Sequence, residues 1–266
     1  MPTITSLQNP RVKAAIRLRD RRHRRKQGRI RIDGARELGR AIRAGLPIAE
    51  AFVCEPLCQN DEGRRVLAEL RNSGADLLAV TEAVFEKLAF GDRADGVLGV
   101  APMPRPTLAD LALPQNPLVA VLEGVEKPGN VGAVLRTGDA AGLAALVVAD
   151  GRTDLHNPNA IRASLGTIFT LPCCTATAQE TLDWLRRQGL AIYAARVDGS
   201  VLYTEVNLRG PAAIVLGSEA EGLTDLWSGT DVIPIRLPML GAADSLNVSA
   251  TAAVLFYEAL RQRTHA

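Results

Sequence analysis

The sequence predicts an α/β protein with a smaller N-terminal domain and a larger C-terminal domain that contains a parallel sheet. Residues 102–117 hold five of the 15 prolines. Because proline fixes φ and lacks an N–H donor, this stretch is expected to be a linker. Before it, short apolar runs alternate with helical patterns. After it, the expected strands are apolar at every position, which is typical of parallel strands buried on both faces.

The alternation sets the order of the elements. The N-terminal part has expected helices at 35–44, 62–71 and 82–88, between expected strands at 29–33, 48–53, 77–80 and 97–101. The C-terminal strands are expected at 118–122, 145–149, 191–195, 212–216 and 232–237. A buried helix is expected over 246–260, which is nearly all apolar up to Glu258. The predicted division is a basic arm (1–28), a small domain (29–101), the linker (102–117) and the C-terminal domain (118–266).

Composition excludes several classes of protein. The chain has 266 residues, 47% hydrophobic and 23% charged, with a mean hydropathy of +0.06. These values are ordinary for a globular protein and exclude a disordered, collagen-like or coiled-coil chain. Four cysteines are too few for a disulfide scaffold. No apolar run approaches the ~20 residues of a membrane helix, and the first residues lack a secretory layout, so a cytoplasmic protein is expected.

A strong charge asymmetry underlies the net charge of +2. Residues 11–43 carry fourteen Arg or Lys against three Asp or Glu. Such a block predicts binding to a polyanion such as a nucleic acid, although a solvated amphipathic helix is the simpler alternative. The block has no interleaved aromatic residues, so contact with the nucleic-acid backbone is favoured over base reading. The expected binding residues are its densest part, Arg21, Arg22, Arg24, Arg25 and Lys26.

The first motif follows the strand at 118–122. The spacing of Gly124 and Gly129 begins like a phosphate-binding P-loop, but Asn130 stands where that loop needs Lys, and the dinucleotide G-x-G-x-x-G spacing fails too. What remains is a turn into a helix with Asn130 as a candidate N-cap. Gly132 and Arg136 share a face of this helix, so a ligand backbone could approach the guanidinium. An ordinary capped helix with a surface arginine is the alternative.

Two further motifs follow later strands. Gly217 and Glu219 come directly after the strand at 212–216, and the carboxyl ends of such strands are where α/β sheets bind ligands. Ser245 or Asn247 can cap the helix that follows. The side chains around that loop suit an apolar slot for a flat ring, and they are Leu237, Met239 and Leu246. Each motif alone is as typical of a turn or a cap as of a site.

No metal site is expected. Cys54 and Cys58 have no second ligand pair, and Cys173 and Cys174 are simply adjacent, so all four are interpreted as buried or incidental thiols. No Ser/His/Asp set occurs, and His156 is interpreted as a loop residue.

Taken together, the three motifs resemble those of the SpoU/TrmH family of S-adenosylmethionine-dependent RNA ribose 2′-O-methyltransferases, in the SPOUT superfamily. Residues 157–172 resemble the family's intervening segment, and 29–101 resemble an L30e-like substrate-binding extension. The resemblance implies a trefoil-knotted C-terminal domain, one of the rare exceptions to unknotted chains, and a homodimer. Glu123 and Lys127 depart from the family pattern, because members often carry Asp at both positions.

The resemblance also implies roles for residues. S-adenosylmethionine would be surrounded by Leu216, Gly217, Leu237, Met239 and Leu246. Arg136 would act on the target hydroxyl, and the site would be completed by Asn130, Glu219, Ser245 and Asn247. Because a guanidinium seldom releases a proton, Arg136 is interpreted as a group that pairs with the phosphate next to the target ribose, rather than as a base.

Three alternatives stay open. Ribosomal RNA is the favoured substrate, but transfer RNA is also compatible with the basic segment. A non-catalytic RNA-binding module would not need the full polar set, which favours an enzyme. An enzyme that uses another nucleotide cofactor, such as a kinase, is disfavoured by the failed P-loop spacing.

Overall fold

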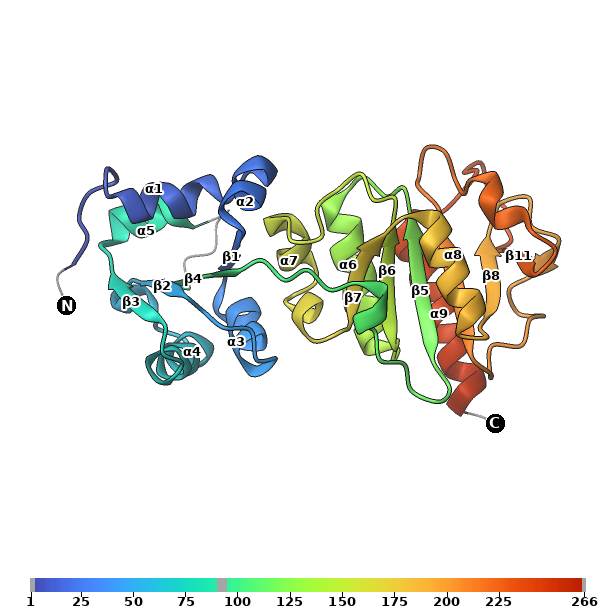
Figure 1. Ribbon diagram of the computed structural model, residues 1–266, viewed down its shortest axis with the longest axis horizontal. Helices are drawn as coiled ribbons and strands as arrows, with labels where there is room; N and C mark the ends of the chain where they lie inside the picture. The colour runs from blue at the N-terminus through green and yellow to red at the C-terminus, as the bar shows by residue number, and fades with distance from the viewer. Residues whose placement is uncertain (1–2, 90–94, 265–266) are drawn as a thin grey trace. The chain divides into compact units, whose positions relative to one another are not determined.

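The computed structural model describes residues 3–89 and 95–264. The chain forms two compact units (Figure 1). The first comprises Met1–Pro104 and His156–Thr170, and the second comprises Arg105–Leu155 and Leu171–Ala266. The expected division placed all of 118–266 in the C-terminal domain, whereas residues 156–170 belong to the first unit.

The first unit is built on a four-stranded mixed sheet in the order β1-β4-β2-β3. Its strands are β1 (Arg29–Asp33), β2 (Glu50–Val53), β3 (Asp76–Ala79) and β4 (Val97–Pro102). Strands β2 and β3 are parallel, and β4 runs antiparallel to both β1 and β2. The helices of this part are α3 (Ala35–Arg43), α4 (Asp61–Asn72) and α5 (Glu82–Leu88), and the short η1 covers Glu55–Leu57. Every one of these strands and α-helices was expected to within two residues.

The basic N-terminal segment is part of this unit's core. It forms α1 (Pro10–Arg17) and α2 (Arg21–Gln27). Val12, Ala15 and Leu18 are buried in one hydrophobic cluster with Phe52 and Phe85. A separate arm over residues 1–28 is therefore not what the structure contains, because the apolar side of α1 needs this cover.

The second unit is built on a seven-stranded sheet among the described residues, in the order β7-β6-β5-β10-β8-β11-β9. All its neighbouring strands are parallel. The expected strands are present as β5 (Leu118–Glu123), β6 (Ala145–Ala149), β8 (Ala191–Ala195), β10 (Ala212–Leu216) and β11 (Val232–Arg236). Two strands were not expected, β7 (Cys173–Ala176) and β9 (Val201–Leu202). Both lie at the edges of the sheet, where short strands without an apolar run suffice.

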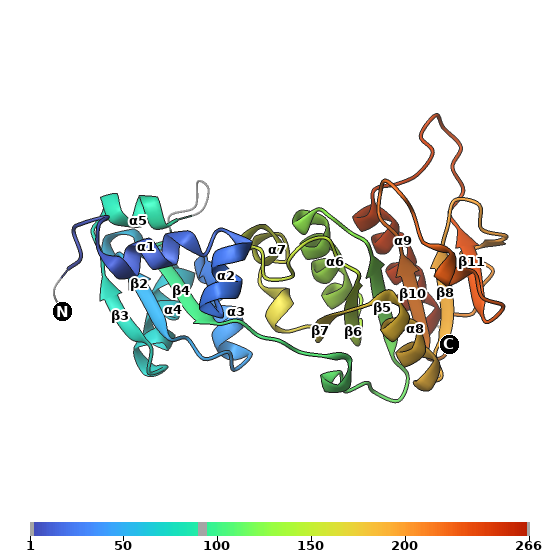
Figure 2. The same cartoon turned by 45° about the horizontal axis from the view of Figure 1, so that its top comes forward.

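Helices cover both faces of this sheet. The two helices α6 (Pro128–Ala140) and α9 (Val248–Thr264) pack against each other on one face (Figures 1 and 2). The other face is covered by α8 (Ala178–Arg187), whose Leu182 and Leu185 are buried with Val121 of β5. The remaining short elements are α7 (Pro158–Ala163) and η3 (Thr167–Phe169) in the first unit, and η2 (Leu108–Asp110) and η4 (Asp225–Ser228) in the second.

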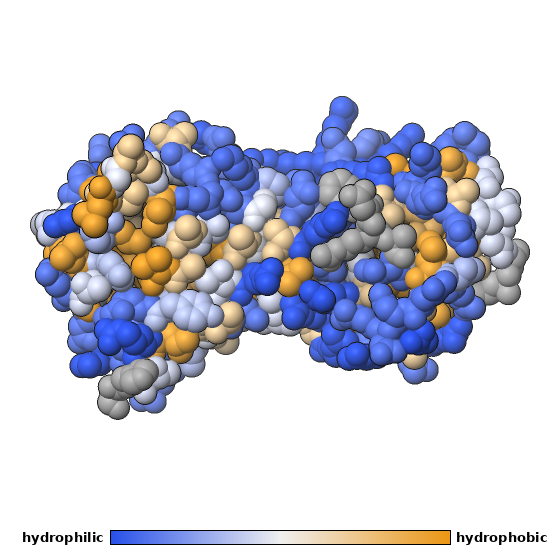
Figure 3. Space-filling view, turned by 180° about the vertical axis from the view of Figure 1, so that it is seen from behind, coloured by the Kyte–Doolittle hydropathy of each residue, from blue (hydrophilic) through white to orange (hydrophobic). Residues whose placement is uncertain are grey.

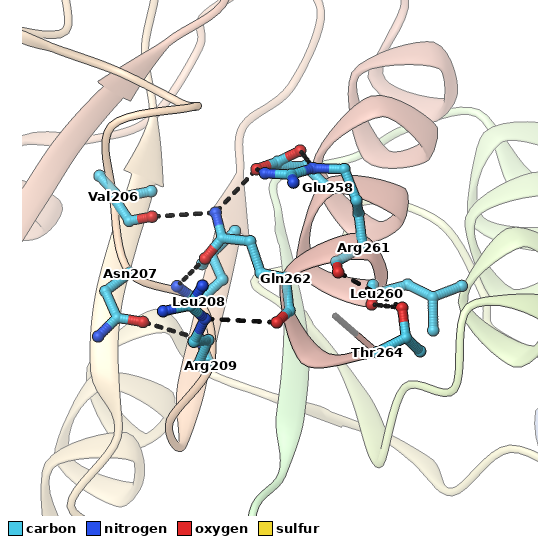
Figure 4. Close-up of polar contacts among 9 residues, drawn as sticks. All are labelled: Val206, Asn207, Leu208, Arg209, Glu258, Leu260, Arg261, Gln262 and Thr264. Carbon is cyan, nitrogen blue, oxygen red and sulfur yellow. Dashed lines mark hydrogen bonds and ion pairs between the residues drawn. The ribbon is translucent and has the colours of Figure 1, made fainter. Parts of the chain in front are cut away.

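The C-terminal end of α9 is fixed by a buried glutamine (Figure 4). Gln262 accepts a hydrogen bond from the Leu208 N–H at 2.8 Å and donates to the Val206 carbonyl at 3.1 Å and to Glu258 at 2.8 Å. These bonds tie the last turns of α9 to the segment that leads into β10.

Within the described ranges, no helix is both long and apolar enough to cross a membrane. The parallel strands of the second unit have their carboxyl ends at one edge of the sheet. The polar loops of the three motifs follow the strands at this edge.

Candidate active site

A cavity of about 440 Å³ lies at the carboxyl ends of β8, β10 and β11. Its walls are the end of β10 and the loops after these three strands. Seven of the residues expected at a site line it together: Leu216, Gly217, Glu219, Leu237, Met239, Ser245 and Leu246. The two motifs that seemed weak singly therefore converge on one hollow, as the carboxyl ends of parallel strands favour.

The loop after β10 folds into a tight turn. Ser218 and Gly222 exchange two backbone hydrogen bonds, each 3.1 Å long. A Cβ atom at Gly217 would lie 2.2 Å from the Gly222 carbonyl carbon, so this first position accepts no side chain. Gly222 has φ +68°, a left-handed conformation that glycine adopts without strain. The two glycines of the motif thus shape the loop that presents Glu219.

Glu219 is the centre of the polar site. Asn130 Nδ2 donates to its Oε1 at 2.7 Å, Asn247 Nδ2 donates to the same oxygen, and Lys127 Nζ pairs with Oε2. The hydrogen bond from Lys127 is the largest cause that lowers the pKa of Glu219, against the opposing effect of burial. The carboxylate therefore joins all three motifs in its ionised form.

Both asparagines were expected as candidate helix caps, and only Asn247 is one. The residue before α6 is Lys127, and Asn130 is the third residue inside that helix, so its expected role as N-cap is wrong. Its amide is directed to Glu219 instead. Asn247 directly precedes α9, and its Oδ1 accepts from the Ser249 N–H at 2.9 Å. Asn247 thus caps α9 and bonds Glu219 at once, whereas Ser245 lies in the cavity wall.

Arg136 lies on α6, the helix that carries Asn130, and its side chain is exposed. Gly132, one turn before it in α6, is buried, so the two residues differ in exposure although their spacing is that of one helix face. Among the described residues, the cavity lining does not include Arg136. Its exposed side chain is therefore accessible to solvent and is not part of the cavity wall.

The cavity combines apolar walls with carboxylates. Leu216, Leu237, Met239 and Leu246 supply a surface for a flat ring, and methionine adapts to such rings. Asp198, Glu219, Glu221 and Asp244 supply negative charge. S-adenosylmethionine has a flat adenine and carries positive sulfonium and ammonium groups, so these residues fit it. The volume also lies within the usual range for small-molecule sites.

The expected site omits the loop after β8. Arg196 and Asp198 line the cavity and form a two-point ion pair, with N–O distances of 3.0 and 3.3 Å. Hydrogen bonds from Arg196 lower the pKa of Asp198. The signal that could have found them is their position, because they directly follow an apolar strand whose end lies beside β10.

The five basic residues expected to bind RNA differ in exposure. Arg21, Arg22, Arg25 and Lys26 are exposed on α2. Arg24 is fully buried, and its guanidinium donates to the carbonyls of Leu18 and Arg19 at 2.8 and 2.7 Å. Its expected role in RNA binding is therefore corrected, because a buried guanidinium that bonds the end of α1 cannot reach a phosphate.

The four cysteines are free thiols. Burial raises the pKa of Cys58 to about 11 and that of Cys173 to about 12, so these two thiols are protonated at neutral pH. Among the residues in the described ranges, no group of three or more His, Cys, Asp or Glu side chains could hold a metal ion.

Both units match known protein families. Residues 117–257 match the SpoU rRNA Methylase family, and residues 9–99 match the MRM3-like substrate binding domain. The 23S rRNA (guanosine-2′-O-)-methyltransferase RlmB of Vibrio parahaemolyticus is 32% identical over 80% of this chain and 89% of its own. The 23S rRNA (guanosine(2553)-2′-O)-methyltransferase RlmP of Bacillus subtilis is 28% identical over 97% of this chain and 98% of its own.

Solved structures extend the comparison over the whole chain. A crystal structure of an RNA 2′-O ribose methyltransferase is 45% identical, covers 99% of this chain and 100% of its own, and has a TM-score of 0.86. The SpoU methyltransferase AviRb from Streptomyces viridochromogenes, solved with AdoMet, is 26% identical, covers 97% of this chain and 99% of its own, and has a TM-score of 0.87. Its three motifs meet at Glu219, and its match over residues 117–257 shows that the chain belongs to the SpoU rRNA Methylase family.

Proposed function

We propose that this protein transfers a methyl group from S-adenosylmethionine to a ribose 2′-hydroxyl of ribosomal RNA. The observation that carries the proposal is the convergence at Glu219, where asparagines of the first and third motifs bond the carboxylate of the second beside the cavity. The named relatives act on 23S rRNA, which supports ribosomal RNA over transfer RNA.

The residues of the chain divide the work of binding and orientation. When bound, the cofactor would supply a methyl group activated by a sulfonium, with S-adenosylhomocysteine as the leaving group and the hydroxyl proton released to water. Leu216, Leu237, Met239 and Leu246 would hold its adenine. Arg136 pairs with the phosphate beside the target ribose, which orients the 2′-hydroxyl and lowers the cost of its developing negative charge. Orientation of this kind contributes on the order of 7–11 kcal/mol at its limit.

The exposed basic residues of α2 provide affinity for the RNA backbone. Arg21, Arg22, Arg25 and Lys26 are exposed on one short helix of the first unit. The match of that unit to a substrate binding domain supports the same role. Phosphate contacts of this kind position an RNA without reading its sequence, so selection of the nucleotide is expected to depend on RNA shape.

The second unit is also proposed to be knotted and to form a homodimer. Strand β10 lies between β5 and β8, although it follows both in the chain, and this order supports the family's knot. Ala250, Val254 and Tyr257 form an exposed stripe along α9. Hydrophobic side chains also reach the surface of this unit on the face drawn in Figure 3. A second copy of the chain would cover such a stripe. Light scattering measures the molecular mass in solution, and we expect the wild type to be a dimer and Val254→Glu to be a monomer.

A cytoplasmic location is proposed together with the RNA substrate. It is compatible with four cysteines that are all free thiols, since structural disulfides belong to oxidising compartments.

The test is transfer of a labelled methyl group. Purified protein is incubated with labelled S-adenosylmethionine and, separately, with ribosomal and transfer RNA from a strain that lacks the gene. We expect label in ribosomal RNA alone. Label in transfer RNA alone would show that transfer RNA is the substrate in place of ribosomal RNA. Binding of RNA without any methyl transfer would indicate a non-catalytic module.

A further inference from the structure

One buried carboxylate beside the site has no part in the proposed chemistry. Glu123 is the last residue of β5 and is 3% exposed. Its Oε2 accepts from the Thr224 N–H at 2.9 Å, and its Oε1 accepts from the Thr224 hydroxyl at 2.8 Å. Both oxygens of the carboxylate are therefore used on one residue that is 101 positions away in the sequence.

Thr224 ends the loop that carries Glu219. This loop begins after Leu216, which pairs with Leu122 in the parallel register of β10 and β5. It continues through Gly222 and Leu223, which line the cavity. Its first end is thus held against β5 by the sheet, and its second end is held against β5 by Glu123. Between these two anchors the loop can keep only a narrow range of positions.

We propose that Glu123 is a positioning residue for S-adenosylmethionine binding, which acts by closing the loop of residues 217–223 onto β5. The inference rests on the proposed function. A carboxylate suits this task because it accepts two hydrogen bonds at once, and hydrogen bonds to charged acceptors are stronger than neutral ones. When both acceptors are removed, the loop wall and Glu219 lose their fixed distance from the strand ends.

The experiment measures the dissociation constant of S-adenosylmethionine by calorimetry on the full chain. Glu123→Ala removes both acceptors. Glu123→Gln is the conservative variant, because its amide oxygen accepts from the Thr224 N–H while its amide nitrogen donates to the hydroxyl. Thr224→Val removes the hydroxyl bond alone and keeps the residue's shape.

The chain offers a matched control. Glu180 accepts from the N–H and hydroxyl of Thr177 at 3.0 and 2.8 Å, the same pair of bonds, at the start of α8. Glu180 is exposed and uses one oxygen for both bonds. Glu180→Ala therefore removes a carboxylate with the same kinds of donor from a place where no residue lines the cavity.

We expect Glu123→Ala to raise the dissociation constant about tenfold, as loss of a charge-assisted hydrogen bond predicts. Thr224→Val should raise it a few-fold, and Glu123→Gln and Glu180→Ala should leave it within about twofold of the wild type. If Glu123→Ala does not fold, the dissociation constant of S-adenosylmethionine for Thr224→Val decides whether the inference holds. Unchanged affinity in Thr224→Val and in any folded Glu123→Ala protein overturns the inference. Absence of binding by the wild type instead overturns the proposed function.

Discussion

Three amide and ammonium donors converge on Glu219, and each comes from a different place in the site. Asn130 lies in the first turn of α6, Lys127 precedes that helix, and Asn247 precedes α9. The family resemblance placed Asn130, Glu219 and Asn247 in one site. The sequence could not show which of them touch, because the contacts depend on the order of strands in the sheet. Lys127 was visible only as a departure from the family pattern.

The pH dependence of cofactor binding tests the role of Lys127. Lys127 lowers the pKa of Glu219, so the ionised carboxylate persists until the pH falls through that lowered value. In Lys127→Met the pKa of Glu219 rises toward the ordinary value of about 4.3. The loss of S-adenosylmethionine binding on acidification should therefore begin at a higher pH than in the wild type. The control is Lys87→Met, which changes an exposed lysine of the first unit. If S-adenosylmethionine affinity of Lys127→Met falls at the same pH as that of the wild type, Lys127 does not have this role.

Arg136→Lys tests bidentate pairing with a phosphate. Lysine keeps the charge but presents a single point donor in place of the planar fork. We expect kcat to fall about 10²-fold, while affinity for S-adenosylmethionine stays unchanged because Arg136 lies outside the cavity lining. Single-turnover methylation measures the change, with Arg187→Lys on α8 as the control. Near-normal turnover in Arg136→Lys would show that orientation by the guanidinium is the wrong explanation.

At the scale of elements, strands buried on both faces were the most predictable part of the molecule. Strands β6, β8 and β10 match their expected ranges, because continuous apolar runs leave little choice of boundary. The helix expected over 246–260 begins at Val248 and is only partly buried. Its apolar composition could not distinguish burial in this chain from burial against a partner.

Helix α2 provides a prediction about stability. Arg24 links the end of α1 to α2 through the carbonyls of Leu18 and Arg19, and these acceptors lose their donor in Arg24→Ala. We expect a loss of about 2 kcal/mol in the free energy of unfolding. The exposed neighbour in Arg25→Ala should change it by less than about 0.5 kcal/mol. Urea denaturation measures both, and equal effects would mean that Arg24 is not a structural residue.

The same helix provides a prediction about RNA binding. Replacing Arg22, Arg25 and Lys26 by alanine removes exposed charges without touching the buried Arg24. For every phosphate that the protein no longer neutralises, the slope of log affinity against log salt becomes shallower by about 0.7–0.9. We expect the triple variant to have a slope shallower by about 2 in filter binding across a salt series. A slope equal to that of the wild type would place the RNA elsewhere.

At the scale of the whole molecule, the sequence predicted two α/β parts with a parallel sheet in the second, and the structure contains both. It did not predict that residues 156–170 belong to the first unit. Gly166 there lies with φ +83° against Glu37 of α3, and Arg40 donates to the Leu165 carbonyl at 2.7 Å. Contacts between segments more than a hundred residues apart leave no periodic trace in either segment.

The identity of the methylated atom is the most direct test of the proposed function. RNA modified by the wild-type protein is digested to nucleosides, and the product is identified by mass spectrometry. We expect one new nucleoside that carries its methyl group on the ribose. A methyl group on a base would contradict the proposed function, because pairing of Arg136 with the adjacent phosphate is proposed to orient the ribose 2′-hydroxyl and not a base atom.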